Sequence, residues 1–206
     1  MGEMSAEIIL SLAQARARRD HLASFPSRAL AGMMEKSRRA LALFQHHDGI
    51  TGTAKDHVVD DYGRRLLGGL HDAKRVVAEC ANFLLQADRT SYSFDPATGP
   101  EFALDETRDN HNSLPEKPVL TLNTGASEPS GGQAVVLYNS LAQPRSEVVS
   151  VLTDWPYVEV LGPDARPLHS QVEPLWPSEG EPDGRPRAGV YSVKFVADLT
   201  GLAVAK

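Results

Sequence analysis

The sequence predicts an α+β fold in which a three-helix bundle is followed by an antiparallel β-sandwich region. Between residues 5 and 88, apolar residues recur at every third or fourth position, which is the period of an amphipathic helix. After residue 133 they gather in short runs separated by turn residues, a pattern typical of strands. The residues between are rich in Pro, Gly, Asn, Ser and Thr, as linkers and long loops are. The predicted domains are therefore a helical domain at 1–89, a linker or long loop at 90–132, and the start of a C-terminal β-sandwich domain at 133–206.

Three helices are expected in the first domain. The first begins near Ala6, and Pro26 and Ser27 then interrupt the pattern, so that Ser27 is the expected N-cap of the second helix. The third helix starts near Ala54. It carries the longest apolar stripe of the chain, which consists of Val58, Tyr62, Leu66, Leu70, Ala73, Val77, Cys80 and Leu84. Three amphipathic helices with short connections favour a bundle, because each must bury one face.

About five short strands are expected in the last domain. Their apolar runs lie at 134–139, 147–152, 158–161, 172–175 and 190–196. The joints between them are short and rich in turn residues, which favours antiparallel pairing over parallel strands connected by helices.

Composition narrows the range of partners and chemistries. A formal net charge of -6 argues against nucleic acid as a partner, because binding to phosphates favours a basic surface. The single cysteine, Cys80, provides no disulfide framework and no multi-cysteine metal site. Since it lies on the apolar stripe of the third helix, it is expected to be a buried structural thiol.

The densest group of reactive side chains is His46-His47-Asp48, at the end of an apolar helical stretch. Imidazole nitrogens and carboxylate oxygens are zinc ligands. Adjacent residues on a regular helix point about 100° apart, so one histidine is expected to bind a metal and the other to lie beside it. A catalytic zinc needs about three protein ligands, so further ligands would have to come from residues outside this chain.

Simpler interpretations of this segment remain open on spacing alone. A histidine at a helix end is often a cap or a packed surface group. Asp48-Gly49 fits an ordinary turn in which Gly49 supplies a positive φ, and Thr51 or Thr53 would serve as the N-cap of the third helix.

A resemblance to a known family favours the metal site. The stretch 43–56, Leu-Phe-Gln-His-His-Asp-Gly-Ile-Thr-Gly-Thr-Ala-Lys-Asp, and the following 58–62, Val-Val-Asp-Asp-Tyr, resemble a segment of the class II α-mannosidases. These enzymes form glycoside hydrolase family 38, and the similarity is greatest to the Golgi α-mannosidase II type. It continues more diffusely through 109–118, 135–141, 148–152 and 158–163.

The resemblance implies a zinc-dependent retaining enzyme that hydrolyses terminal α-D-mannose residues in N-glycan processing. In that case His47 ligates Zn2+, and Asp48 and His46 contact the sugar. The family's nucleophile, its acid/base and its other zinc ligands come from an upstream α/β domain, so no catalytic residue is expected in this chain. Asp60 and Asp61 are expected to be solvated charges on the outer face of the third helix.

The implied partners are a mannose-containing N-glycan and that upstream catalytic α/β domain. The implied compartment is the Golgi lumen, within a Golgi membrane protein, and the lysosome is the alternative. Ile50-Thr51 favours the Golgi type over a lysosomal-type α-mannosidase. The isolated chain is expected to be inactive. A competing hypothesis from another class is a non-catalytic carbohydrate-binding or interaction module.

Overall fold

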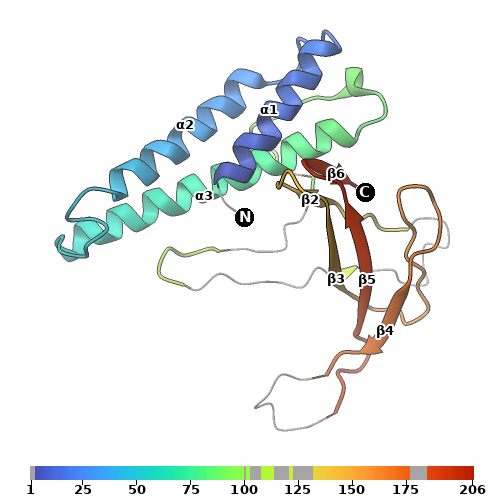
Figure 1. Ribbon diagram of the computed structural model, residues 1–206. Coiled ribbons are helices and arrows are strands. Elements are labelled where there is room, and N and C mark those ends of the chain that lie inside the picture. Colours follow the sequence, from blue (N-terminus) through green and yellow to red (C-terminus); the bar gives the residue numbers. More distant parts are fainter. Residues whose placement is uncertain (1–2, 100, 103–107, 114–120, 123–131, 177–184) are drawn as a thin grey trace. The chain divides into compact units, whose positions relative to one another are not determined.

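The structure is a computed structural model that describes the chain except residues 1–2, 100, 103–107, 114–120, 123–131 and 177–184 (Figure 1). The chain divides into two compact units, Met1–Glu116 and Lys117–Lys206. The first is helical and the second is built from strands, so the predicted α+β class is confirmed. The predicted domain bounds at 1–89, 90–132 and 133–206 stay predictions, and much of the predicted linker lies outside the described residues. Among the described residues, no helix has the length and apolar character to cross a bilayer.

The first unit contains the three predicted helices, α1 (Glu3–Arg19), α2 (Ser27–Phe44) and α3 (Asp56–Leu85), followed by the short 3-10 helix η1 (Arg89–Ser91). In Figure 1, α2 and α3 lie side by side and run in opposite directions, joined by a loop of residues 45–55. The beginning of α2 differs from the prediction. Ser27 is the first residue of α2, and the capping position is Pro26, which makes no side-chain cap.

The core of the helical unit lies where α3 meets α1 and α2. The predicted stripe of α3 is buried or half-buried along its whole length, which confirms its period. At one end of the core, Phe25 and Phe83 pack with ring centroids 4.5 Å apart, and Tyr92 adds an edge contact to Phe83 at 5.3 Å. The largest fully buried helical side chains are Phe83, Ile9, Leu30, Met34, Val76 and Cys80.

A buried polar group joins this core to the chain that follows α3. The hydroxyl of Tyr92 donates to Glu79 Oε2 over 3.0 Å, and Arg75 lies 3.2 Å from Glu79 Oε1. Arg75 also donates to the carbonyl of Asp95 over 2.8 Å and lies over the ring of Phe94, 5.5 Å from its centroid. Arg75 and Glu79 of α3 and Tyr92 of the segment after it therefore form one charged and largely buried group.

Tyr92 is expected to make the helical unit sensitive to alkaline pH. Burial, followed by the charge of Glu79, raises the pKa of the Tyr92 phenol. A pKa that is raised in the folded state contributes stability that is complete below the unfolded value of about 10 and is lost as pH rises above it. Urea unfolding followed by far-ultraviolet circular dichroism should therefore show a smaller alkaline loss of stability for Tyr92→Phe than for the wild type. Tyr157→Phe is the matched control, because Tyr157 is 83% exposed and should change nothing; an equal alkaline loss in Tyr92→Phe and the wild type would contradict the assignment.

The second unit is built on a four-stranded sheet in the order β1-β3-β5-β4. Its strands are β1 (Thr121–Leu122), β3 (Arg145–Thr153), β5 (Tyr191–Leu199) and β4 (Ser170–Pro174). β5 pairs antiparallel with both β3 and β4, whereas β1 pairs parallel with β3. A second pair, β2 (Leu137–Asn139) and β6 (Ala203–Ala205), is antiparallel. The core of this unit consists of Val151, Val193, Phe195 and Ala197 with half-buried apolar neighbours.

One predicted strand is wrong. Residues 158–161 form no strand, and they take part in ladder pairing through a single bridge between Leu161 and Pro167. The chain reverses at Gly162-Pro163-Asp164, where the amide of Gly162 donates to the carbonyl of Arg166 over 2.9 Å. The partner of Leu161 in the bridge is Pro167, which has no N–H to donate to a ladder. The other four predicted strands correspond to β2, β3, β4 and β5, with shifted ends.

Candidate metal centre

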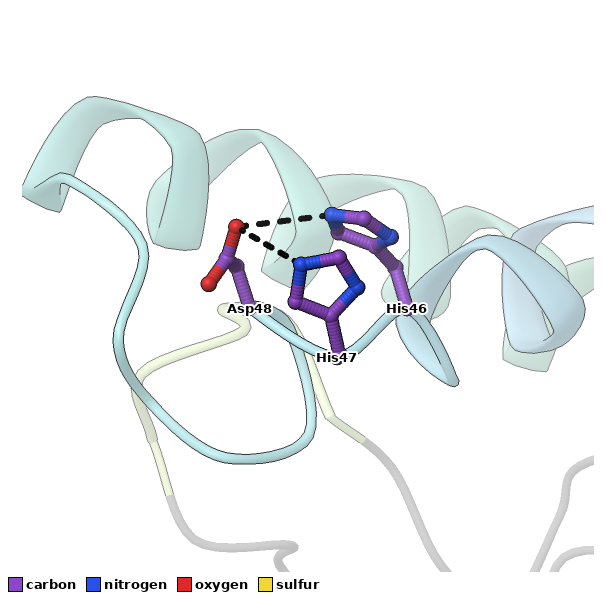
Figure 2. Close-up of side chains that lie close together, drawn as sticks. All are labelled: His46, His47 and Asp48. Carbon is purple, nitrogen blue, oxygen red and sulfur yellow. Dashed lines mark ion pairs between the residues drawn. The ribbon is translucent and has the colours of Figure 1, made fainter.

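The three predicted site residues lie together in the connection between α2 and α3. Helix α2 ends at Phe44, and the chain then turns through His46, His47 and Asp48 before α3 begins at Asp56. The carbonyl of His46 accepts hydrogen bonds from the amides of Gly49 and Ile50 over 2.8 and 3.1 Å. Figure 2 shows the two imidazoles and the carboxylate projecting to the same side of this turn.

The side chains converge closely enough to share one cation. One ligand atom from each residue lies within 4.8 Å of the others, and this is the sole group of three metal-binding side chains found among the described residues. Asp48 Oδ2 lies 3.5 Å from His46 Nε2 and 3.6 Å from His47 Nε2. Two donors on one tetrahedral zinc, with bonds of about 2.0–2.1 Å, lie about 3.4 Å apart. The observed spacing therefore fits zinc with small side-chain adjustments.

The local helix end changes one sequence-based argument. A separation of about 100° between the two histidines assumes that the helix continues through them. Because α2 stops at Phe44, the imidazole centroids lie 4.1 Å apart and both rings approach Asp48. The structure thus brings all three predicted residues together and places Asp48 Oδ2 where it can act as a third donor.

Asp48 is held as a carboxylate by its surroundings. Thr53 Oγ1 donates to Asp48 Oδ1 over 2.9 Å, and this hydrogen bond is the main reason that the pKa of Asp48 is lowered. The nearby charges of His47 and then His46 lower it further. Asp48 is therefore ionised at neutral pH and keeps one oxygen available to accept hydrogen bonds or to bind a cation.

The hydroxyl groups of the turn serve the site rather than the third helix. The N-cap of α3 is Lys55, which makes no side-chain cap, so neither Thr51 nor Thr53 caps this helix. Thr51 donates to the carbonyl of His47 and lies 3.0 Å from Thr53 Oγ1. Thr53 supports the site through Asp48, a role that the sequence analysis did not assign to it. The sequence indicates this contact only by placing a hydroxyl side chain a few positions after an aspartate in the same turn.

The glycines of the turn have different roles from the predicted one. The positive φ lies at Gly52, at 71°, and not at Gly49. Gly49 is instead required by close approach, because a Cβ placed there would lie 2.6 Å from the carbonyl oxygen of Phe44. Phe44 in turn packs edge-on against Tyr62, with ring centroids 6.0 Å apart, so the turn is anchored to α3.

The site is open to solvent. The side chain of His47 is 82% exposed, and those of Asp48 and His46 are 49% and 44% exposed. The carboxylates Asp60 and Asp61 lie outside this cluster and pair with Arg64 and Arg65, one turn further along α3. Among the residues described, Asp48 is therefore the one carboxylate of the donor cluster.

Comparison with known proteins identifies the helical segment. Residues 5–84 match the family model described as "Alpha mannosidase middle domain". Mouse alpha-mannosidase 2x is 42% identical over 201 residues, which are 97% of this chain and 16% of that protein. Human alpha-mannosidase 2 is 37% identical over 173 residues, 84% of this chain and 14% of that protein. Drosophila melanogaster alpha-mannosidase 2 is 35% identical over 143 residues, 69% of this chain and 12% of that protein.

The family model and the relatives point to one class of protein, the α-mannosidases. The chain belongs to the class II α-mannosidase family, as the resemblance of residues 43–62 predicted. It spans about 16% of the length of the first curated relatives that it matches.

Proposed function

We propose that this chain is part of a zinc-dependent retaining α-mannosidase, in which His47 supplies one zinc ligand. The observation that carries the proposal is the convergence of His46, His47 and Asp48, with ligand atoms within 4.8 Å of one another. It gains support from the relatives, whose names are alpha-mannosidase 2x and alpha-mannosidase 2. Three side chains at zinc-compatible spacing are a specific arrangement, whereas a capping histidine needs no neighbouring carboxylate.

Each residue has a distinct role in this proposal. His47, the most exposed of the three, would hold the metal through an imidazole nitrogen. Asp48, ionised and supported by Thr53, would accept hydrogen bonds from sugar hydroxyls, and His46 would contact the sugar beside it. Zinc, when bound, supplies Lewis-acid polarisation of the sugar oxygens.

The substrate in this proposal is a terminal α-D-mannose residue of an N-glycan. A retaining glycosidase needs a nucleophile and an acid/base carboxyl group about 5–5.5 Å apart, and an upstream α/β domain would supply both, together with the remaining zinc ligands. The compartment that accompanies this function is the Golgi lumen. Fluorescence microscopy of a tagged full-length protein would test the compartment, and a lysosomal signal would favour the alternative type.

The purified 206-residue chain is expected to bind Zn2+ at one weak site and to leave an aryl α-mannoside intact. Complete structural zinc sites contribute about 10–16 kcal/mol. A site with two or three exposed donors should be much weaker, with a Kd above about 1 µM. Isothermal titration calorimetry should detect the heat of zinc binding in the wild type and no such heat in His47→Ala.

The matched control is His57→Ala, because His57 is an exposed histidine in the first turn of α3 and lies outside the donor cluster. It should bind zinc as the wild type does. Unchanged zinc binding by His47→Ala would show that His47 is not a zinc ligand. Hydrolysis of the aryl α-mannoside by the chain alone would contradict the need for an upstream domain.

A further inference from the structure

A short segment beyond the helical bundle is fastened to the side of α3 by two histidines. His71 Nε2, on α3, lies 2.8 Å from the carbonyl oxygen of Arg108. His111 Nε2, on the segment, lies 2.8 Å from Asp60 Oδ1 on α3. Residues 108–113 thus contact α3 at two places, each through an imidazole.

The segment between these contacts is folded on itself. Arg108 donates to the carbonyls of His111 and Asn110 over 2.8 and 3.3 Å. Asn110 Oδ1 accepts from the amide of Asn112 over 3.0 Å, and its carbonyl accepts from the hydroxyl of Ser113 over 2.8 Å. Because these bonds fix the turn, His111 is presented to the helix in one position.

Helix α3 has a notch that accepts the imidazole. A Cβ placed at Gly63 would overlap the His111 ring, with the ring Cγ only 3.0 Å away. Glycine inside a helix costs about 1 kcal/mol relative to alanine, so its presence there calls for a reason. Gly68, also within α3, has nothing within 4 Å of such a Cβ. The two glycines therefore differ in the one respect that matters, which is contact with His111.

The attraction between His111 and Asp60 depends on charge. The His111 side chain is 15% exposed, and its Nε2 is buried without a partner in hydrogen-bonding geometry. A contact at 2.8 Å that is not a directed hydrogen bond is mainly coulombic, and it is strong only while the imidazole is protonated. Histidine side chains change charge between about pH 5 and 8.

Asp60 has a second partner that makes release possible. Arg64, one turn further along α3, pairs with Asp60 Oδ2. When His111 loses its proton, Asp60 keeps Arg64 and is not left unpaired. His71 can donate to the carbonyl of Arg108 in either charge state, so that contact does not depend on pH in the same way. Among the described residues, Asp60 on α3 contacts the His111 imidazole, and Arg64 pairs with the same carboxylate. On its own segment, Arg108 donates to the carbonyl of His111 and Asp109 lies two positions before it, while His71 on α3 contacts the carbonyl of Arg108.

We propose that His111, seated against Gly63 and paired with Asp60, is a pH-sensitive clasp that fastens residues 108–113 to α3. Acidic solution closes the clasp because it protonates His111. Neutral and alkaline solution loosens it while Arg108 stays attached through His71.

Hydrogen exchange on the 206-residue chain tests the pH dependence. After correction for intrinsic exchange rates, the amides of residues 108–113 should be about two- to fivefold more protected near pH 5.5 than near pH 8, the range expected of a partly exposed ion pair. His111→Ala should abolish this difference, and Asp60→Asn should abolish it without removing the ring. Equal protection at the two pH values in the wild type, or a persistent difference in both variants, would overturn the proposal.

Glycine substitutions test the notch independently. Alanine at Gly68 should raise the folding equilibrium constant about fivefold through helix propensity, as measured by urea unfolding. Alanine at Gly63 should give no such gain in the wild type, because it displaces His111. In the His111→Ala background the gain of about fivefold should return. Equal gains from Gly63→Ala and Gly68→Ala in the wild type would show that His111 does not occupy the notch.

Discussion

Replacing His47 with alanine is expected to lower the α-mannosidase activity of a full-length enzyme that contains this segment by more than about 100-fold. Loss of an outer-shell partner of a metal ligand already costs about 10–100-fold in affinity or activity, so loss of a direct ligand should cost more. Mouse alpha-mannosidase 2x is a suitable host, because its similarity extends over 97% of this chain. A chimera carrying this segment would be assayed for hydrolysis of an aryl α-mannoside and for bound zinc.

The control for that experiment is His57→Ala in the same chimera. His57 follows the turn by only a few residues, yet it is absent from the group formed by His46, His47 and Asp48. Activity and zinc content should both survive the control substitution. His46→Ala should retain zinc and lose part of the activity, since His46 is proposed to contact the sugar and not the metal. Near-normal turnover of the His47→Ala chimera would refute the proposed ligand.

Replacing Glu79 with alanine is expected to lower the free energy of unfolding of the helical unit by about 3 kcal/mol. Glu79 is the shared acceptor for the Tyr92 hydroxyl and the Arg75 guanidinium, and the side chains of Glu79 and Arg75 are only 10% and 18% exposed. Removing one partner of a buried pair leaves the other charge without compensation, which costs about 3–5 kcal/mol. Arg75 keeps its bonds to the carbonyls of Asp95 and Pro96, so the lower end of that range is expected.

Urea unfolding followed by far-ultraviolet circular dichroism would measure this loss. Glu35→Ala is the matched control, because Glu35 pairs with Arg39 one turn away at 2.6 Å, with side chains 58% and 79% exposed. An exposed pair contributes about 0.2–1 kcal/mol, so the free energy of unfolding should change little in the control. Glu79→Gln should fall between them, since an amide can still accept from Tyr92. A loss for Glu79→Ala no larger than that of the control would mean that the buried cluster does not stabilise the unit.

The helices could be predicted from the sequence because their signal is periodic and long. The stripe from Val58 to Leu84 repeats over most of α3, so an error at one position changes little. The ends are set by single residues and were harder to place. Ser27 has the chemistry of an N-cap but lies inside α2, and Thr53 has the same chemistry but bonds to Asp48.

The strands were predictable where their apolar runs are long. β3 and β5 each extend over 9 residues and were both expected. β6 has 3 residues and β1 has 2, too few for alternation to appear. Residues 158–161 have the composition of a strand, but backbone pairing decides the structure, and their pairing is limited to one bridge with Pro167, which has no N–H to donate.

The donor cluster was predicted from residue types and from resemblance, and its geometry was not. Convergence of the two histidines depends on the end of α2 at Phe44, a boundary that hydrophobic periodicity defines poorly. The contacts of Tyr92 with Glu79 and of His111 with Asp60 were also missed. Each joins α3 to an irregular segment, where no repeating pattern indicates which residues meet.

The buried position of Cys80 has a practical consequence. Burial, together with the charge of Glu79, raises the pKa of this thiol, so it stays protonated and unreactive in neutral solution. It is the one cysteine in the sequence. A second cysteine introduced at an exposed position would therefore be the sole site for a maleimide dye or spin label in the native protein. The chain can thus be labelled site by site without first removing a native thiol.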